Sequence, residues 1–116
     1  MLPGIGRERE APLAGLLGRG VTWTGDLRFE GRVRVDGTFS GSVYTDDVLE
    51  VGEGGRVEGT VDAATLIVAG VVEGVVHARD RVRVESTGTL LGEVVAVNLE
   101  VVPGARIRAS VRVGAP

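Results

Sequence analysis

The sequence predicts an all-β fold, a single-stranded parallel β-solenoid of about five to six coils, each of roughly 17 residues. Two observations lead to this fold class. The 116 residues are 43% hydrophobic but only 3% aromatic, and 22 of them are Val. A core of β-branched aliphatic side chains favours strands. From residue 21 onward, two linked apolar patterns each recur five times, and internal repetition of this kind is typical of solenoids.

The first pattern is a pair of apolar residues separated by one other residue. The first members lie 16 or 17 residues apart, and the pairs are Val33/Val35, Leu49/Val51, Leu66/Val68, Val82/Val84 and Leu99/Val101. The second pattern is an apolar residue, then Gly two positions later and Val four positions later. It begins at Phe39, Val57, Val72, Leu90 and Ile107, with Ala109 replacing Gly in the last copy. Both patterns predict short alternating strands that turn one side inward, where stacked coils bury it together.

The residues inside the apolar pairs indicate whether the coils can stack in register. In a parallel stack, each of these residues lies beside its counterpart in the next coil. They are, in order, Arg34, Glu50, Ile67, Arg83 and Glu100. Opposite charges would meet at 34/50 and at 83/100, and like charges would meet nowhere. The pattern therefore favours parallel coils in register.

The chain is expected to hold one solenoid domain at residues 21–113, with a flexible tail at 1–20 and a short tail at 114–116. The first 20 residues include two prolines and a mixed-charge run, which interrupt regular structure. That run and its short apolar stretch do not resemble a secretory signal. No stretch of about 20 apolar residues is present to span a membrane.

The N-terminal tail has two open interpretations, a flexible terminus or a short peptide that contacts a membrane or a partner. In the membrane interpretation, Leu2 and Ile5 insert between lipids while Arg7 and Arg9 lie near anionic headgroups. Two glutamates interleave with these arginines, so each tail would bind weakly. Many tails along one assembly would bind together.

The composition excludes most catalytic chemistry. The chain has no Cys, no Lys and a single His, which excludes cysteine nucleophiles, Schiff-base lysines and three-histidine zinc sites. We expect no catalytic, cofactor-binding or metal-binding residue. The enzymatic alternative is a hexapeptide-repeat acyltransferase using His77, but the repeat places His77 on the outer face between Asp62 and Val95. The formal net charge of −3 provides no attraction to nucleic acid.

A run of aliphatic residues is expected on the outer surface of adjacent coils. Its members are Ile67, Val71, Val75, Leu91 and Val95. Exposed apolar residues on neighbouring rungs form a candidate lateral contact patch, although a loop or the N-terminal tail could equally cover them. In a second functional alternative, this patch serves a binding module that forms discrete oligomers and does not polymerise.

The two ends of the predicted solenoid lack a recognisable cap. Open ends leave backbone groups unpaired and would join end to end into a filament. The residues expected to carry this assembly are Val21, Trp23, Leu27, Arg106, Ile107, Val111 and Val113. If Arg106, Arg108 and Arg112 cluster at the C-terminal end, their charges would weaken that junction.

Residues 25–37 (GDLRFEGRVRVDG) closely resemble the opening block of the bactofilins, and Pro103-Gly104-Ala105 fits the same family. The resemblance covers about residues 20–113 and implies a right-handed β-helix. It also implies a bacterial cytoskeletal protein that forms non-polar filaments without nucleotide, through head-to-head and tail-to-tail junctions. Bactofilins often carry an aromatic residue after the terminal Pro-Gly-Ala, where this chain has Arg106 and then Ile107.

The family resemblance further implies a cytoplasmic location at the inner face of the cell membrane. The N-terminal tail, from Leu2 to Arg9, would supply the lipid contact. The partners would be further copies of the chain, membrane lipid and cell-envelope proteins, with no nucleotide or nucleic acid. The expected role is a scaffold in cell shape and envelope organisation.

Overall fold

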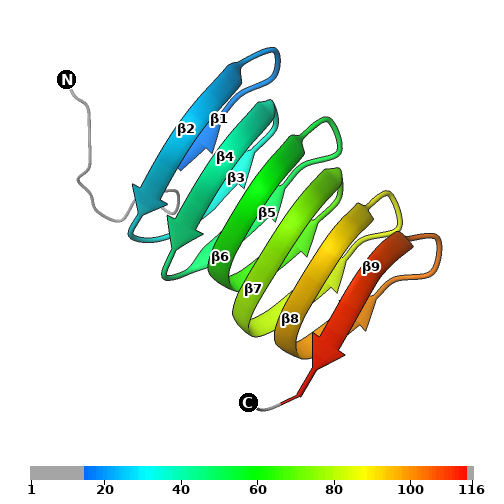
Figure 1. Ribbon diagram of the computed structural model, residues 1–116. Helices are drawn as coiled ribbons and strands as arrows, with labels where there is room; N and C mark the ends of the chain where they lie inside the picture. Colours follow the sequence, from blue (N-terminus) through cyan, green and yellow to red (C-terminus); the bar gives the residue numbers. More distant parts are fainter. Residues whose placement is uncertain (1–14, 115–116) are drawn as a thin grey trace.

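The computed structural model of the chain describes residues 15–114, whose nine strands belong to one continuously wound sheet (Figure 1). The strands are β1 (Gly15–Leu17), β2 (Thr22–Phe29), β3 (Val33–Val35), β4 (Thr38–Thr45), β5 (Val48–Val51), β6 (Arg56–Val68), β7 (Val71–Val84), β8 (Thr89–Val101) and β9 (Arg106–Val113). Every strand pairing is parallel. The predicted all-β parallel solenoid is therefore confirmed.

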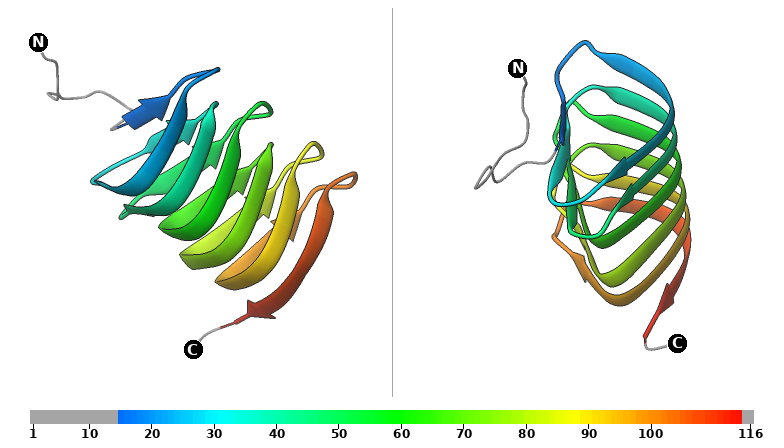
Figure 2. Two further views of the ribbon diagram at one scale, coloured as in Figure 1. Left: turned by 45° about the horizontal axis from the view of Figure 1, so that its top comes forward. Right: turned by 90° about the vertical axis from the view of Figure 1, so that its left-hand side faces the viewer.

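The coils have two long sides, which Figure 2 shows from two directions. One side is formed by strands that pair in the order β2, β4, the first parts of β6, β7 and β8, and β9. On the other side β1, β3 and β5 lead to the second parts of β6, β7 and β8. The register shifts within β6 and β7, between Ala63 and Thr65 and between Ala78 and Arg81, occur where the chain passes between the two sides.

The core consists of columns in which each coil contributes one side chain at the same register position. One column runs through Phe39, Val57, Val72 and Leu90, all at most 1% exposed. Parallel columns contain the valines of both repeat patterns and the short side chains of three alanines. Because each coil covers the next, burial of apolar area stabilises the stack only where a neighbour is present.

A column of glycines runs beside the aliphatic columns. It contains Gly25, Gly41, Gly59, Gly74 and Gly92, which pair with one another in register. Their φ angles lie between 113° and 138°, in a region that L side chains rarely adopt. A Cβ placed on Gly59 would overlap the carbonyl oxygen of Gly41 in the neighbouring coil. The Gly of the second repeat pattern is therefore a steric requirement of stacking.

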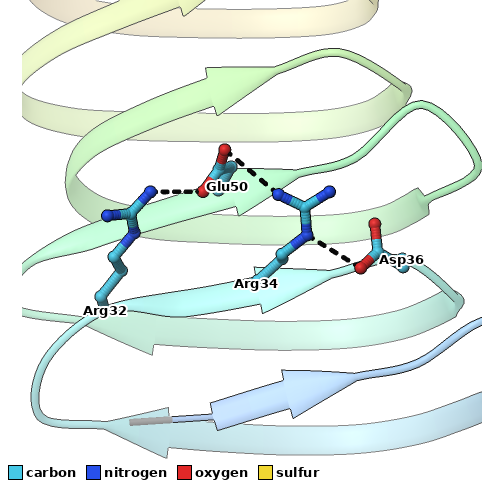
Figure 3. A network of polar contacts seen from close by, with 4 residues as sticks. All are labelled: Arg32, Arg34, Asp36 and Glu50. Atoms are coloured by element: carbon cyan, nitrogen blue, oxygen red, sulfur yellow. Dashed lines mark hydrogen bonds and ion pairs between the residues drawn. The ribbon is translucent and has the colours of Figure 1, made fainter. Parts of the chain in front are cut away.

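The outer ladder of charges forms as the sequence predicts, with Arg34 opposite Glu50 and Arg83 opposite Glu100. Arg34 Nη1 lies 3.3 Å from Glu50 Oε2, and Arg34 also donates to Asp36 at 2.8 Å (Figure 3). The hydrogen bond to Asp36 raises the pKa of Arg34, partial burial opposes the rise, and the charges of Asp36 and Glu50 add to it. Exposed ion pairs contribute little stability, so the main effect of the ladder is on register.

The start of the domain differs from the expected boundary at residue 21. β1 pairs with β3, with Gly15 opposite Val33 and Leu17 opposite Val35. Gly15 and Leu17 thus occupy the positions of an apolar pair, but the Gly at the first position hides the pattern. At the other terminus, β9 ends at Val113.

Candidate self-assembly interface

Each end of the solenoid presents the edge of a sheet. Among residues 15–114, β1 and β2 pair with strands on one side only, β3 and β4 respectively. At the opposite end, β9 pairs only with β8. The two edges lie at the far ends of the stack (Figure 1). Their outward backbone N–H and C=O groups can pair with another strand, which is the usual liability of an open sheet edge.

At the N-terminal end, an aromatic side chain continues the core column of Phe39. Trp23 lies opposite Phe39 in the register and is 41% exposed, whereas Phe39 is 0% exposed. Leu27 continues the column of Val43 and is only partly buried. Phe29 also packs partly against the core. Trp23 and Leu27 have an apolar register neighbour in the next coil, and Phe29 has the buried Thr45; none of the three is covered from the other side within the described residues.

The C-terminal end exposes valines that would be core residues in any other coil. Val101, Val111 and Val113 are 48%, 40% and 50% exposed. Their register partners in the preceding coil, Val84, Val94 and Ala96, are at most 2% exposed. Leu99 and Ile107 are also only partly buried. Val101 and Val111 are exposed because no further coil covers them, whereas at Val113 a larger side chain also replaces the alanine of the column.

The structure brings five of the seven predicted assembly residues to the open ends of core columns. These five are Trp23, Leu27, Ile107, Val111 and Val113. Val21 lies in the turn before β2, where its carbonyl oxygen accepts a hydrogen bond of 2.9 Å from the backbone N–H of Thr38. Arg106 lies in the outward column with Thr89. It therefore borders the end face without belonging to its apolar part.

Three residues of the end faces were missed at the sequence level. They are Phe29, Leu99 and Val101. The signal was available for two of them, because Leu99 and Val101 form the last apolar pair of the first repeat pattern. In a stack without a cap, the residues of the last copy of a core pattern lie on the end face. The same holds for the last residue of every core column.

The expected lateral patch is divided between the two sides of the solenoid. Ile67 lies in the second part of β6, between Glu50 and Arg83. The other four members, Val71, Val75, Leu91 and Val95, lie in the first parts of β7 and β8. These four are diagonal neighbours on adjacent strands. Val75 is exposed, at 38%, and the other three are half-buried. Ile67 is therefore separate from the apolar surface around Val75.

The remaining predictions concern His77 and the tail. His77 lies between Asp62 and Val95 in the register and is exposed, as the repeat pattern predicts. The membrane-contact residues Leu2, Ile5, Arg7 and Arg9 lie outside the described residues. Within residues 15–114, no helix is long and apolar enough to cross a bilayer.

A family model described as "Bactofilin: Polymer-forming cytoskeletal" matches residues 15–112. The chain belongs to the bactofilin family. The match begins at Gly15, the residue at which β1 begins, so this bactofilin has its first strand before the block at residues 25–37 that carries the resemblance. The resemblance inferred from that block is confirmed, and the family is a structural, cytoskeletal one.

Two solved structures resemble this bactofilin closely. A cryo-electron microscopy reconstruction of double helical filaments of Thermus thermophilus bactofilin matches with a TM-score of 0.82 and 36% identity, covering 85% of this chain and 98% of that chain. A crystal structure of a point mutant of Thermus thermophilus bactofilin matches with a TM-score of 0.67 and 33% identity, covering 75% of this chain and 97% of that chain. No curated protein matches the sequence significantly.

Proposed function

We propose that this bactofilin assembles end to end into filaments that need no nucleotide. The observation that carries the proposal is the exposure of core columns at both ends, by Trp23 at one end and by Val101, Val111 and Val113 at the other. A second copy seated on either end would cover these side chains and pair the open strand edges. Both gains favour association.

We further propose that like ends meet, giving head-to-head and tail-to-tail junctions and a filament without polarity. A head-to-tail junction that kept every core column continuous would place Ile107 over Trp23 and Arg112 over Arg28, because these residues share columns. Like charges directly opposite each other destabilise a sheet. A two-fold junction matches one end face with itself and so separates Arg112 from Arg28. Repulsion between arginines is then confined to the tail-to-tail junction, because β2 carries Asp26 as well as Arg28.

Trp23 provides the first test, because it is the only tryptophan in the chain and lies on the N-terminal end face. We expect filaments in negative-stain electron microscopy of purified protein without nucleotide. We also expect a blue shift of tryptophan emission as the protein concentration rises, because the head-to-head junction removes water from the indole. A monodisperse monomer with constant emission at high concentration would contradict the proposed assembly.

The filament is proposed to lie on the cytoplasmic face of the cell membrane through the N-terminal tail. Removal of residues 1–10 is expected to abolish co-sedimentation of filaments with anionic liposomes, because apolar insertion by Leu2 and Ile5 is lost. The double variant Leu2→Ser/Ile5→Ser keeps Arg7 and Arg9 and separates insertion from charge. Unchanged co-sedimentation of the truncated protein would refute the membrane role of the tail.

The cellular role proposed for the filament is a scaffold to which cell-envelope proteins attach. End-to-end growth leaves both long sides of the solenoid free along the whole filament, including the apolar surface around Val75. The acyltransferase alternative has little to support it, because the chain's single histidine, His77, lies exposed beside Asp62 and Val95. Membership of a polymer-forming family also favours assembly over the non-polymerising binding module.

A further inference from the structure

The last strand carries positive charge that the structure does not neutralise. Arg106, Arg108 and Arg112 are exposed on β9, and among residues 15–114 none of them takes part in an ion pair. Six arginines of earlier coils do pair with carboxylates. These are Arg32, Arg34, Arg56, Arg79, Arg81 and Arg83. Arg28 of β2 also has no ion pair among the described residues, but it lies over the Tyr44 ring. β9 therefore differs from the coils that contain Arg32 to Arg83, in a chain whose overall net charge is −3.

The carboxylates nearest to these arginines along the register do not pair with them. Glu93 lies opposite Ser110, between the positions of Arg108 and Arg112, yet it forms no ion pair within the described part of the chain. Glu100 pairs with Arg83 at 3.3 Å. β9 itself contains no acidic residue. The positive charge of the final strand is thus available to an external anion.

Two of the arginines line a common depression at the rim of the end face. Arg106 and Arg108 surround it together with Thr89, Leu91 and Ile107. Residues two apart on one strand point to the same side, with Cα atoms about 6.7 Å apart. Two long guanidinium side chains at this spacing can both reach one tetrahedral oxyanion, which arginine binds through paired hydrogen bonds. The Thr89 hydroxyl offers a further donor.

A tail-to-tail junction brings two copies of β9 together and doubles this charge. Six arginines would then lie along one pair of strands, and like charges on neighbouring strands oppose association. The N-terminal end has no equivalent excess, because β2 carries one charge of each sign, at Asp26 and Arg28. The two junctions should therefore respond differently to anions.

We propose that Arg106 and Arg108 form a binding site for a phosphate-class oxyanion, and that this anion is required for a strong tail-to-tail junction. The second half of the inference rests on the proposed end-to-end assembly, whereas the binding site does not. A bound anion carries negative charge between the arginines of the two β9 strands and so offsets their mutual repulsion. The fraction of sites that hold an anion then determines how readily tail-to-tail junctions form and filaments grow. Head-to-head pairing does not depend on the anion.

Inorganic pyrophosphate is the probe, compared with sodium chloride at equal ionic strength. We expect the critical concentration for filaments, measured by sedimentation, to be about tenfold lower in pyrophosphate, a difference of about 1.4 kcal/mol per junction. The emission of Trp23 should shift at the same protein concentration in both salts, because it reports the head-to-head junction. Equal critical concentrations in the two salts would show that salt acts on the junction only by ionic screening. That result would refute the role of the anion site in assembly.

The double variant Arg106→Thr/Arg108→Ser removes both arginines of the site and replaces them with residue types that other coils carry at the same positions. Thr38 and Ser40 of β4 occupy the same two columns, so the solenoid tolerates these side chains there. The variant should form filaments equally well with and without pyrophosphate. It should also lose the pyrophosphate binding that isothermal titration calorimetry detects in the parent chain. Arg19→Ser, at an exposed arginine near the other end, is the matched control and should change neither result.

The calorimetric measurement separates failure of this inference from failure of the proposed assembly. If no filaments form and Trp23 stays exposed in every salt, the proposed assembly fails, but pyrophosphate binding by the parent chain and its loss in the double variant would still support the site. If the parent chain does not bind pyrophosphate, or the double variant binds it equally well, the site is refuted whatever the filaments do.

Discussion

Gly59→Ala is expected to lower the free energy of unfolding by about 3 kcal/mol or more, one of the largest single-methyl effects available in this fold. Two costs combine. The φ of Gly59 is 127°, outside the regions that residues with a side chain normally adopt, and such a backbone conformation costs about 1–3 kcal/mol. The added Cβ also overlaps the carbonyl oxygen of Gly41, a backbone atom that can move only if two coils separate. Chemical denaturation followed by circular dichroism measures the loss.

Gly54→Ala is the matched control for Gly59→Ala. Gly54 lies in the exposed turn before β6, outside the positive-φ region, and the nearest atom to an added Cβ is the Asp36 carbonyl oxygen at 3.7 Å. The methyl group there meets only ordinary contact and restricts the unfolded chain, so stability should stay constant or rise by about 0.5 kcal/mol. Equal destabilisation by the two substitutions would refute the steric account of the glycine column.

Much of the architecture could be predicted from the sequence because stacking makes it locally repetitive. The apolar pairs, the Gly-centred units and the alternating charges at Arg34, Glu50, Arg83 and Glu100 all express one constraint, which is that a residue must fit the residue above it. The register observed in β3 to β9 follows from that constraint alone. The first strand was missed because Gly15 substitutes for an apolar residue and leaves Leu17 without a visible partner.

The candidate interface was less predictable, because exposure depends on where the stack stops. Val101 has the same residue type and column as Val84, and only the absence of a further coil among the described residues distinguishes its surroundings. Similarly, Ile67 was grouped with Val75 by their closeness in sequence. The chain passes to the other side of the solenoid at Ala69 and Gly70, between β6 and β7. Apolar residues before and after this glycine therefore lie on different surfaces, although the apolar run continues through it.

Blocking one end of the molecule should give discrete dimers. In Val111→Arg, the guanidinium replaces a valine at the open end of a core column, where a tail-to-tail partner would bury it. Burying an unpaired charge costs several kcal/mol, and about 4 kcal/mol corresponds to roughly a thousandfold weaker junction. Head-to-head pairing remains, so sedimentation velocity should show dimers. Trp23→Arg should give tail-to-tail dimers for the same reason, in buffer that contains pyrophosphate to occupy the site at Arg106 and Arg108.

Val75→Arg is the control for these end-face variants. Val75 is 38% exposed, close to the 40% of Val111, but it lies on the long side of the solenoid, where Glu93 is its register neighbour. An arginine there can pair with that carboxylate and should leave filaments intact. Loss of filaments in Val75→Arg would indicate that assembly depends on the long side and would count against the end faces.

The double variant Trp23→Arg/Val111→Arg completes the test and distinguishes the two possible filament geometries. With like ends meeting, each single variant leaves one junction intact and gives dimers, and only the double variant is monomeric. With unlike ends meeting, every junction contains both faces, so either single substitution alone would already give monomers. Dimers in both single variants therefore require two different junctions, each formed by an end face with its own copy.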